Sequence, residues 1–154
     1  MKKIVIQTPE EMFALGQKLA GEYKILFLEW ELGAGKTTLV KWFAAGLGID
    51  PQRVNSPTYT YIQEYTSRDT KPKAASWKLQ GNEQTKLLHI DMYNIHSFDQ
   101  LVEKWITELV YEYDCIAIEW PKFIDELWLD GVSVRIDKAD SLSRRISIKD
   151  WMPE

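Results

Sequence analysis

The residues best suited to chemistry form the segment Leu32-Gly33-Ala34-Gly35-Lys36-Thr37-Thr38, which follows an apolar run and opens a stretch with helical periodicity. Gly33 and Gly35 lack a Cβ, so the backbone can turn sharply and present its N–H groups to phosphate oxygens. The N-terminus of the following helix would aim its dipole at the same anion. Lys36 can neutralise the β- and γ-phosphates, and the Thr37 hydroxyl can ligate Mg²⁺. The segment from Gly33 through Ala34 to Thr38 therefore predicts a phosphate-binding P-loop.

One position departs from the P-loop pattern, because Trp30 stands where the first Gly is expected. Three interpretations remain open. The segment is an ordinary Gly-rich loop, a working P-loop, or a P-loop with impaired nucleotide binding. Since the first Gly lies at the strand end, before the residues that wrap the phosphates, a side chain there can point away from the ligand.

Two acidic residues follow apolar runs, Asp91 after residues 87–90 and Glu119 after residues 115–118. A P-loop enzyme needs one carboxylate for the metal shell and another group to orient water. The alternative is that each acid caps a helix or braces a loop. His89 shares a strand face with Asp91, so a metal pair is conceivable, but no third ligand is evident and a hydrogen-bonded structural histidine is favoured.

Two further places are candidates for nucleotide contact. Ser56, Pro57 and Thr58 follow the predicted P-loop helix, where P-loop switches can place a Thr near the γ-phosphate. The alternative is a rigid proline turn that leads into a strand. Arg144 could reach a phosphate, although a charge at a strand edge more often meets water.

Apolar periodicity indicates which elements hold these residues. Strands are expected at 24–29, 54–65, 86–91, 114–118, 132–136 and 144–148, and helices at 8–21, 36–47, 97–109 and 123–128. This alternation predicts a single α/β domain over 1–154: a three-layer P-loop NTPase-like sandwich with a central, mostly parallel sheet and a C-terminal antiparallel strand pair. The polar residues 66–85 are expected to form a flexible insertion. Ligands of such sheets bind where the strands end.

Composition narrows the class of protein further. The 154 residues carry a net charge of −4, which gives no general attraction to nucleic acid. No apolar stretch approaches the length of a membrane span, and the N-terminus lacks a signal-peptide pattern. The single Cys115 lies in an apolar run and excludes an intrachain disulfide. A cytoplasmic protein without a membrane role is expected.

Four motifs together resemble the TsaE (YjeE) family of ATPases that support tRNA threonylcarbamoyladenosine (t⁶A) synthesis. They are Trp30-Glu31-Leu32-Gly33-Ala34-Gly35-Lys36-Thr37-Thr38, Ser56-Pro57-Thr58-Tyr59-Thr60, His89-Ile90-Asp91-Met92-Tyr93-Asn94 and Glu119-Trp120-Pro121. They occur in the family's order and cover nearly the whole chain.

The resemblance implies a small cytoplasmic ATPase that uses ATP and Mg²⁺. It implies binding to the proteins TsaB and TsaD, which modify adenosine 37 of tRNA, so that tRNA is met only indirectly. By matching position, Thr37 and Glu119 would bind Mg²⁺, and Asp91 with Lys36 would serve hydrolysis. Trp120 and Arg144 would lie at the nucleotide.

The chain departs from the family at several motif positions. Trp30, Trp42 and Trp105 stand where the family usually has Gly, Asn94 replaces an Arg, and Met12 replaces a Thr. These departures keep open a docking module that hydrolyses ATP poorly. A small-molecule kinase is a weaker alternative, because the 66–85 segment offers only Arg68 for an arginine lid.

Overall fold

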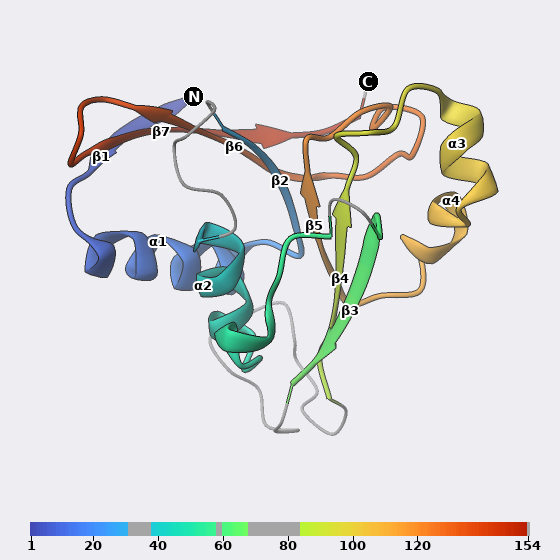
Figure 1. Cartoon of the computed structure of the whole chain (residues 1–154), viewed down its shortest axis with the longest axis horizontal. Coiled ribbons are helices and arrows are strands. Elements are labelled where there is room, and N and C mark those ends of the chain that lie inside the picture. The colour runs from blue at the N-terminus through green and yellow to red at the C-terminus, as the bar shows by residue number, and fades with distance from the viewer. Residues whose placement is uncertain (31–37, 58–59, 68–83, 154) are drawn as a thin grey trace.

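The computed structural model describes residues 1–30, 38–57, 60–67 and 84–153, and their strands form one seven-stranded sheet in the order β1-β7-β6-β2-β5-β4-β3 (Figure 1). The strands are β1 (Lys2–Ile6), β2 (Ile25–Trp30), β3 (Ile62–Thr66), β4 (Lys86–Asp91), β5 (Cys115–Glu119), β6 (Gly131–Lys138) and β7 (Arg144–Trp151). The helices are α1 (Pro9–Glu22), α2 (Thr38–Gly46), α3 (Phe98–Glu103) and α4 (Ile106–Leu109), with a 3₁₀ turn at Pro51–Arg53.

The centre of the sheet is parallel and its outer parts are antiparallel. β6, β2, β5 and β4 run parallel to one another. β7 pairs antiparallel with both β6 and β1, and β3 pairs antiparallel with β4. The predicted α/β class, the parallel core and the C-terminal antiparallel pair are thereby confirmed.

Helices cover both faces of the sheet and create two cores (Figure 1). Side chains alternate between faces along each strand. In β2, Leu26, Leu28 and Trp30 therefore face α1 and α2, whereas Phe27 packs on the side of α3 and α4. This is the three-layer arrangement expected from the alternation of strands and helices.

The first layer contains α1 and α2, and the sequence explains how α1 begins and how the two helices pack. Thr8 caps α1 by accepting a hydrogen bond from the Glu11 N–H at 3.1 Å, and Pro9 occupies the first turn. α1 and α2 approach closely at Gly16, where a Cβ would lie 2.4 Å from the Trp42 Cβ. Only a residue without a side chain permits this contact, which holds α2 against α1.

Three of the predicted elements differ from the structure. The strand expected at 54–65 is confined to β3, because Tyr61 has a φ of 66° and breaks the extended backbone. The helix expected at 97–109 is divided into α3 and α4 by Trp105, whose φ of 62° lies in the left-handed region. Residues 123–128 form turns rather than a helix, with φ values of 58° at Phe123 and 53° at Trp128.

One strand, β1, was not anticipated from the sequence. At the ends of the segment predicted as an insertion, 66–85, Thr66 belongs to β3 and the Ser67 N–H donates to the Thr85 carbonyl at 2.8 Å. Residues 68–83 lie outside the described residues. No helix in the described part of the chain is long and apolar enough to span a membrane.

Candidate functional site

The two predicted acids meet at the carboxyl edge of the parallel strands. Asp91 ends β4, Glu119 ends β5, and the two residues are direct partners in the register of these strands. Both lie on the sheet face that α1 and α2 cover, because Leu87 and Ala117 of the same alternation belong to that core. The strand that leads into the Gly-rich segment, β2, pairs with β5. The structure therefore brings the predicted acids to the end of the sheet where ligands bind.

Glu119 is fully buried, with 0% exposure, and one of its oxygens lacks a hydrogen bond. Its Oε2 accepts from the Ser56 hydroxyl at 3.4 Å. Its Oε1 lies 3.4 Å from the His89 Nε2 without hydrogen-bond geometry, so neither atom has a hydrogen-bond partner among the described residues. A buried carboxylate oxygen without a partner is costly, and a cation relieves that cost.

The surroundings of Glu119 fit a magnesium ion. Mg²⁺ binds through one or two protein oxygens and takes its other ligands from water and phosphate, so it needs no dense cluster. Indeed, the described residues hold no group of three or more His, Cys, Asp or Glu side chains arranged to bind a metal. The second predicted ligand, Thr37, lies outside the described residues.

A buried hydroxyl connects this site to the loop that contains Ser56. The Tyr65 OH lies 3.3 Å from the His89 Nδ1 and accepts from the Asn55 N–H at 3.2 Å. Two acceptors lie within reach of its single hydrogen, the Gln63 Oε1 at 2.6 Å and the Asn55 carbonyl at 3.0 Å. Burial raises the pKa of Tyr65, the Asn55 hydrogen bond opposes the shift, and the charge of Glu119 adds to it. His89 is therefore a structural residue with a partner, as the sequence favoured.

Asp91 is held by its own turn. The side chain is 3% exposed, and its Oδ1 accepts from the Tyr93 N–H at 2.8 Å. The Asp91 N–H donates to the Tyr61 carbonyl at 2.9 Å. These contacts fix the strand end, and they also supply the loop-bracing role that was left open as an alternative.

Trp30 and Trp120 pack against each other, with ring centroids 4.9 Å apart. Trp30 is 4% exposed and belongs to the core beneath α1 and α2. Trp120 is half-buried, has a φ of 53°, and donates its backbone N–H to the Leu28 carbonyl at 2.8 Å. Its ring also contacts the Tyr93 ring, with centroids 5.6 Å apart. The indole at the first P-loop position thus forms part of the hydrophobic core and supports the predicted site aromatic.

Arg144 and Thr38 line the same small hollow, of about 230 Å³, beside the start of α2. Thr8 and Met12 of the first helix lie there too. Arg144 donates through Nη1 to the Ser143 carbonyl at 3.0 Å, which orients the guanidinium. Two of the predicted nucleotide-binding residues, Thr38 and Arg144, are therefore neighbours in space.

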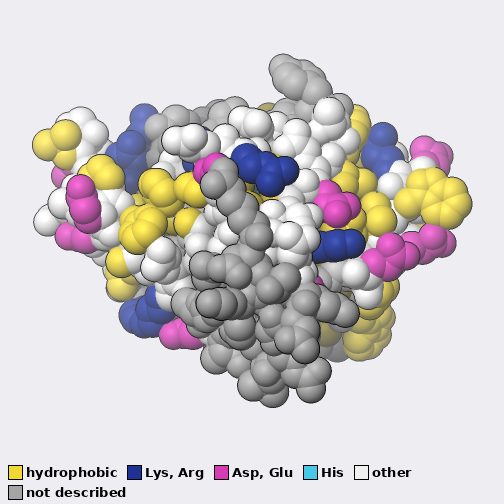
Figure 2. All heavy atoms as spheres, turned by 90° about the horizontal axis from the view of Figure 1, so that it is seen from below, with side chains coloured by type: hydrophobic (Ala, Val, Ile, Leu, Met, Phe, Trp, Pro, Cys, Tyr) yellow, Lys and Arg dark blue, Asp and Glu magenta, His cyan; other side chains and the backbone are white. Residues whose placement is uncertain are grey.

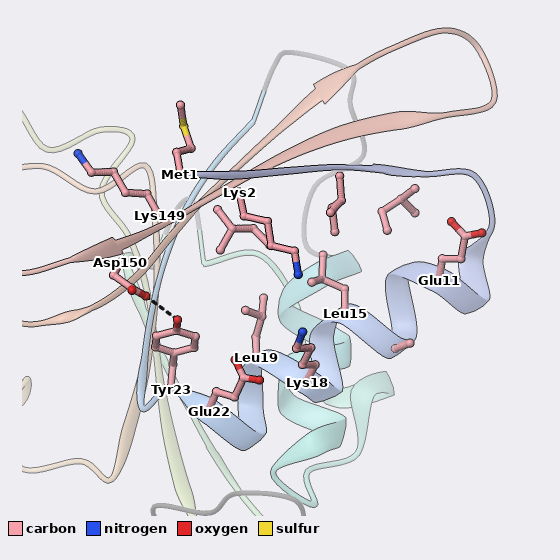
Figure 3. Close-up of a pocket in the computed structure, with 14 residues that line it drawn as sticks. Met1, Lys2, Glu11, Leu15, Lys18, Leu19, Glu22, Tyr23, Lys149 and Asp150 are labelled. Atoms are coloured by element: carbon pink, nitrogen blue, oxygen red, sulfur yellow. Dashed lines mark hydrogen bonds between the residues drawn. The ribbon is translucent and has the colours of Figure 1, made fainter.

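A larger hollow, of about 640 Å³, lies between α1 and the β1–β7 ribbon (Figure 3). Tyr23 and Asp150 close one end of it with a hydrogen bond of 2.5 Å, which together with burial raises the pKa of Tyr23 to about 12. None of the predicted site residues that the structure describes lines this hollow. Although this hollow is larger, it is not a better candidate for a ligand site. No described residue that lines it has a buried polar side-chain atom without a hydrogen bond.

Apart from Trp120, which packs against Trp30 and Tyr93, the predicted site residues fall into three sets. The structure joins Ser56 to Glu119 by a hydrogen bond and sets Asp91 beside it on the next strand, and it places Thr38 with Arg144 at a separate hollow. Pro57 is buried, and its carbonyl accepts from the Tyr61 N–H at 2.7 Å. The remaining predicted residues, Gly33, Ala34, Gly35, Lys36, Thr37 and Thr58, lie outside the described residues.

The sequence analysis missed one residue of the site, Tyr65. The alternation of tyrosines with polar residues predicted a strand here, but it did not predict which groups the Tyr65 hydroxyl contacts. The signal that could have found it is the antiparallel pairing of β3 with β4, which brings Tyr65 near His89.

Comparisons with known proteins agree with the geometry. The profile of the family "Threonylcarbamoyl adenosine biosynthesis protein TsaE" matches residues 6–146. The tRNA threonylcarbamoyladenosine biosynthesis protein TsaE of Bacillus subtilis is 33% identical over 153 residues, covering 96% of this chain and 85% of the relative. The protein of the same name from Aquifex aeolicus is 31% identical over 124 residues, covering 78% of this chain and 77% of the relative.

A solved structure shares the fold. The crystal structure of YdiB from Bacillus subtilis superposes with a TM-score of 0.61 at 26% identity, covering 96% of this chain and 83% of that one. The family profile spans both acids, the Ser56 loop and the Gly-rich segment. With that profile and these relatives, the chain belongs to the TsaE family of threonylcarbamoyl adenosine biosynthesis proteins.

Proposed function

We propose that the protein is a Mg²⁺-dependent ATPase that supports threonylcarbamoyl transfer to adenosine 37 of tRNA by TsaB- and TsaD-like partners in the cytoplasm. The observation that carries this proposal is Glu119, a buried carboxylate at the strand edge beside Asp91 with one oxygen that has no hydrogen bond among the described residues. Family membership supplies the t⁶A pathway as the setting. In addition to that setting, we propose ATP hydrolysis, the use of Mg²⁺ and the TsaB- and TsaD-like partners.

Different residues of the chain would bind the phosphates and the metal ion. Lys36 and the backbone N–H groups from Gly33 to Thr38 would bind the phosphates, and Arg144 would add a cation beside Thr38. Glu119 and Thr37 would hold Mg²⁺, which when bound offsets charge between the β- and γ-phosphates.

Asp91 would orient the attacking water. Its Oδ1 already accepts from the Tyr93 N–H, and a carboxylate oxygen can accept more than one hydrogen bond. Asn94 stands where the family has an Arg, so no arginine finger is recognisable close to this acid. Slow turnover in the absence of partners is therefore expected, since such a finger is worth about 10³–10⁵ in rate.

The test is ATP turnover by the wild-type protein and by Asp91→Asn, each with and without the purified TsaB–TsaD pair. The wild-type rate should rise when the partners are added. Asp91→Asn should bind Mg·ATP with unchanged affinity and hydrolyse it at least a hundredfold more slowly, roughly the loss seen for one catalytic electrostatic or acid–base group. Equal rates for the two proteins would refute the assignment of Asp91.

A second candidate function is a docking module of the same complex that binds nucleotide but hydrolyses it poorly. The packing of Trp30 against Trp120, beside the predicted P-loop, favours it, because a bulky residue occupies the usual Gly position. Intrinsic fluorescence of these tryptophans provides the test. A Mg·ATP-dependent change without turnover, even with partners present, would support the module. Turnover stimulated by the partners would exclude it.

A further inference from the structure

The end of the molecule formed by α3, α4 and the turns after β5 exposes large apolar side chains. Val102 is 51% exposed, Tyr111 64%, and Trp105 and Trp128 are each 65% exposed. The hydrogen bond from the Tyr111 OH to the Leu127 carbonyl ties the α4 turn to the segment that carries Trp128. Hydrophobic side chains lie among Asp and Glu side chains at the right-hand edge of Figure 2, the end where Figure 1 places α3 and α4.

Acidic residues dominate this end. Residues 97–130 contain nine Asp or Glu and two Lys, whereas the rest of the chain contains fourteen acidic and seventeen basic residues. Eight of the nine acids are exposed: Asp99, Glu103, Glu108, Glu112, Asp114, Asp125, Glu126 and Asp130. We name these eight acids with Val102, Trp105, Tyr111 and Trp128 the aromatic–acidic face.

The residues that the structure describes do not neutralise this charge. Lys122 donates from Nζ to the Tyr93 and Ile95 carbonyls at 3.0 and 2.8 Å, and the Lys104 Nζ lies 3.9 Å from the centre of the Tyr61 ring. Both lysines are thus engaged within the fold. No ion pair between described residues involves any of the eight exposed acids.

The two exposed tryptophans have an unfavourable backbone. Trp105 has a φ of 62° and Trp128 a φ of 53°, a region in which a bulky L-residue is strained. Tyr61, Trp120 and Phe123 share this conformation but are half-buried, each with a partner for its ring. Because Trp105 and Trp128 gain little from burial, folding of the chain alone does not account for aromatic side chains at these two positions.

We propose that the aromatic–acidic face docks a protein partner whose matching surface has apolar pockets surrounded by Lys and Arg. Trp and Tyr are the side chains that most often dominate binding energy, and the surrounding carboxylates would select and steer a basic rim. The same carboxylates repel a phosphate backbone, so this face does not bind tRNA. The inference rests on the proposed function for the identity of the partner, the TsaB–TsaD pair.

The test measures binding of the purified TsaB–TsaD pair to the wild-type protein, Trp105→Gly and Trp128→Gly by calorimetry. Each variant should bind at least tenfold more weakly, roughly the loss expected at a central interface tryptophan. Each should also keep or raise the thermal midpoint, since Gly relieves the left-handed strain. A role in folding alone predicts the reverse, a lower midpoint with unchanged affinity. Val5→Thr, on the exposed side of β1, is the matched control and should change neither quantity.

Charge provides a second readout. Glu108→Lys combined with Glu112→Lys should slow association and flatten the dependence of affinity on salt, because both residues lie on the aromatic–acidic face. Wild-type affinity in both tryptophan variants would overturn the proposal. Concentration-dependent self-association that either variant abolishes would overturn it in favour of a second copy of the chain.

Failure of the docking proposal is distinguishable from failure of the proposed function. If the wild-type protein and both variants bind the TsaB–TsaD pair equally, the docking face is wrong and the function stands. If the wild-type protein does not bind the pair, the TsaB–TsaD pair is not the partner of the aromatic–acidic face. ATP turnover that is lost in Lys36→Ala would then still support the ATPase.

Discussion

The Nε2 of His89 lies 3.4 Å from the Oε1 of Glu119, and both side chains are completely buried. On its other side, the His89 ring meets the hydroxyl of Tyr65, which holds both backbone groups of Asn55. Asn55 precedes Ser56, whose hydroxyl returns to Glu119. The proposed metal-binding carboxylate is thus connected to its neighbouring loop through two separate routes.

Removing the Tyr65 hydroxyl should destabilise the protein. Tyr65→Phe leaves the buried His89 Nδ1 without its partner and removes the part-buried hydrogen bonds to Asn55, and a buried unsatisfied group costs about 1–3 kcal/mol. Urea unfolding should show a loss in this range or above it. Tyr113→Phe is the matched control, because its hydroxyl bonds an exposed Glu64 instead. Similar losses for the two variants would contradict the role of this buried network.

Replacing Glu119 by Gln should raise the Mg²⁺ concentration needed for ATP turnover. Gln keeps the shape of the side chain but lacks the charge that attracts the cation. Turnover at saturating ATP should fall by roughly a hundredfold or more, the typical effect of losing one electrostatic stabiliser. A Mg²⁺ titration at fixed ATP checks this expectation. An unchanged titration curve would show that Glu119 only braces the loop through Ser56.

Restoring Gly at position 30 should weaken the fold rather than improve it. Trp30 is 4% exposed and packs on Trp120, and removal of a buried Trp side chain costs roughly 3–5 kcal/mol. Trp105→Gly, the same change at an exposed residue with a φ of 62°, should be neutral or stabilising. Thermal unfolding of the two variants compares them directly. A stabilised Trp30→Gly protein would contradict the described position of the indole.

Tyr23 should make the protein sensitive to alkali. Its hydrogen bond to Asp150, then burial and the charges of Asp150 and Glu22, raise its pKa from 10.0 to about 12. The folded state therefore favours the protonated phenol. This contribution to stability is complete below about pH 10 and is lost as the pH rises to about 12. Urea unfolding of Tyr23→Phe should show a stability deficit at neutral pH that shrinks over this interval. A constant deficit would exclude the linkage.

The sequence predicted the strand edge and its acids well. Asp91 and Glu119 each follow a continuous apolar run, which is typical of a buried parallel strand, and the ends of such strands meet at one edge. The four motifs, in their order along the chain, also indicate the family from the sequence alone. These signals are local in the chain, so a single sequence is sufficient to reveal them.

The sequence predicted neither the break between α3 and α4 nor the contacts of Tyr65. Trp105 fits the apolar periodicity of one long helix, and its side chain gives no hint of a left-handed backbone. The signal that could have indicated one is its position at a usual family Gly. The bonds of Tyr65 to Asn55 and His89 join separate segments, and their direction depends on how β3 pairs with β4.

The most direct test of the account is calorimetric titration of Mg·ATP into the wild-type protein and Lys36→Ala. The account rests on the Gly33–Thr38 segment as the binding site of the polyphosphate. It predicts saturable binding with one nucleotide per chain in the wild type and loss of that binding in Lys36→Ala. Equal affinity in the two proteins, or no binding by the wild type at millimolar Mg·ATP, would contradict it.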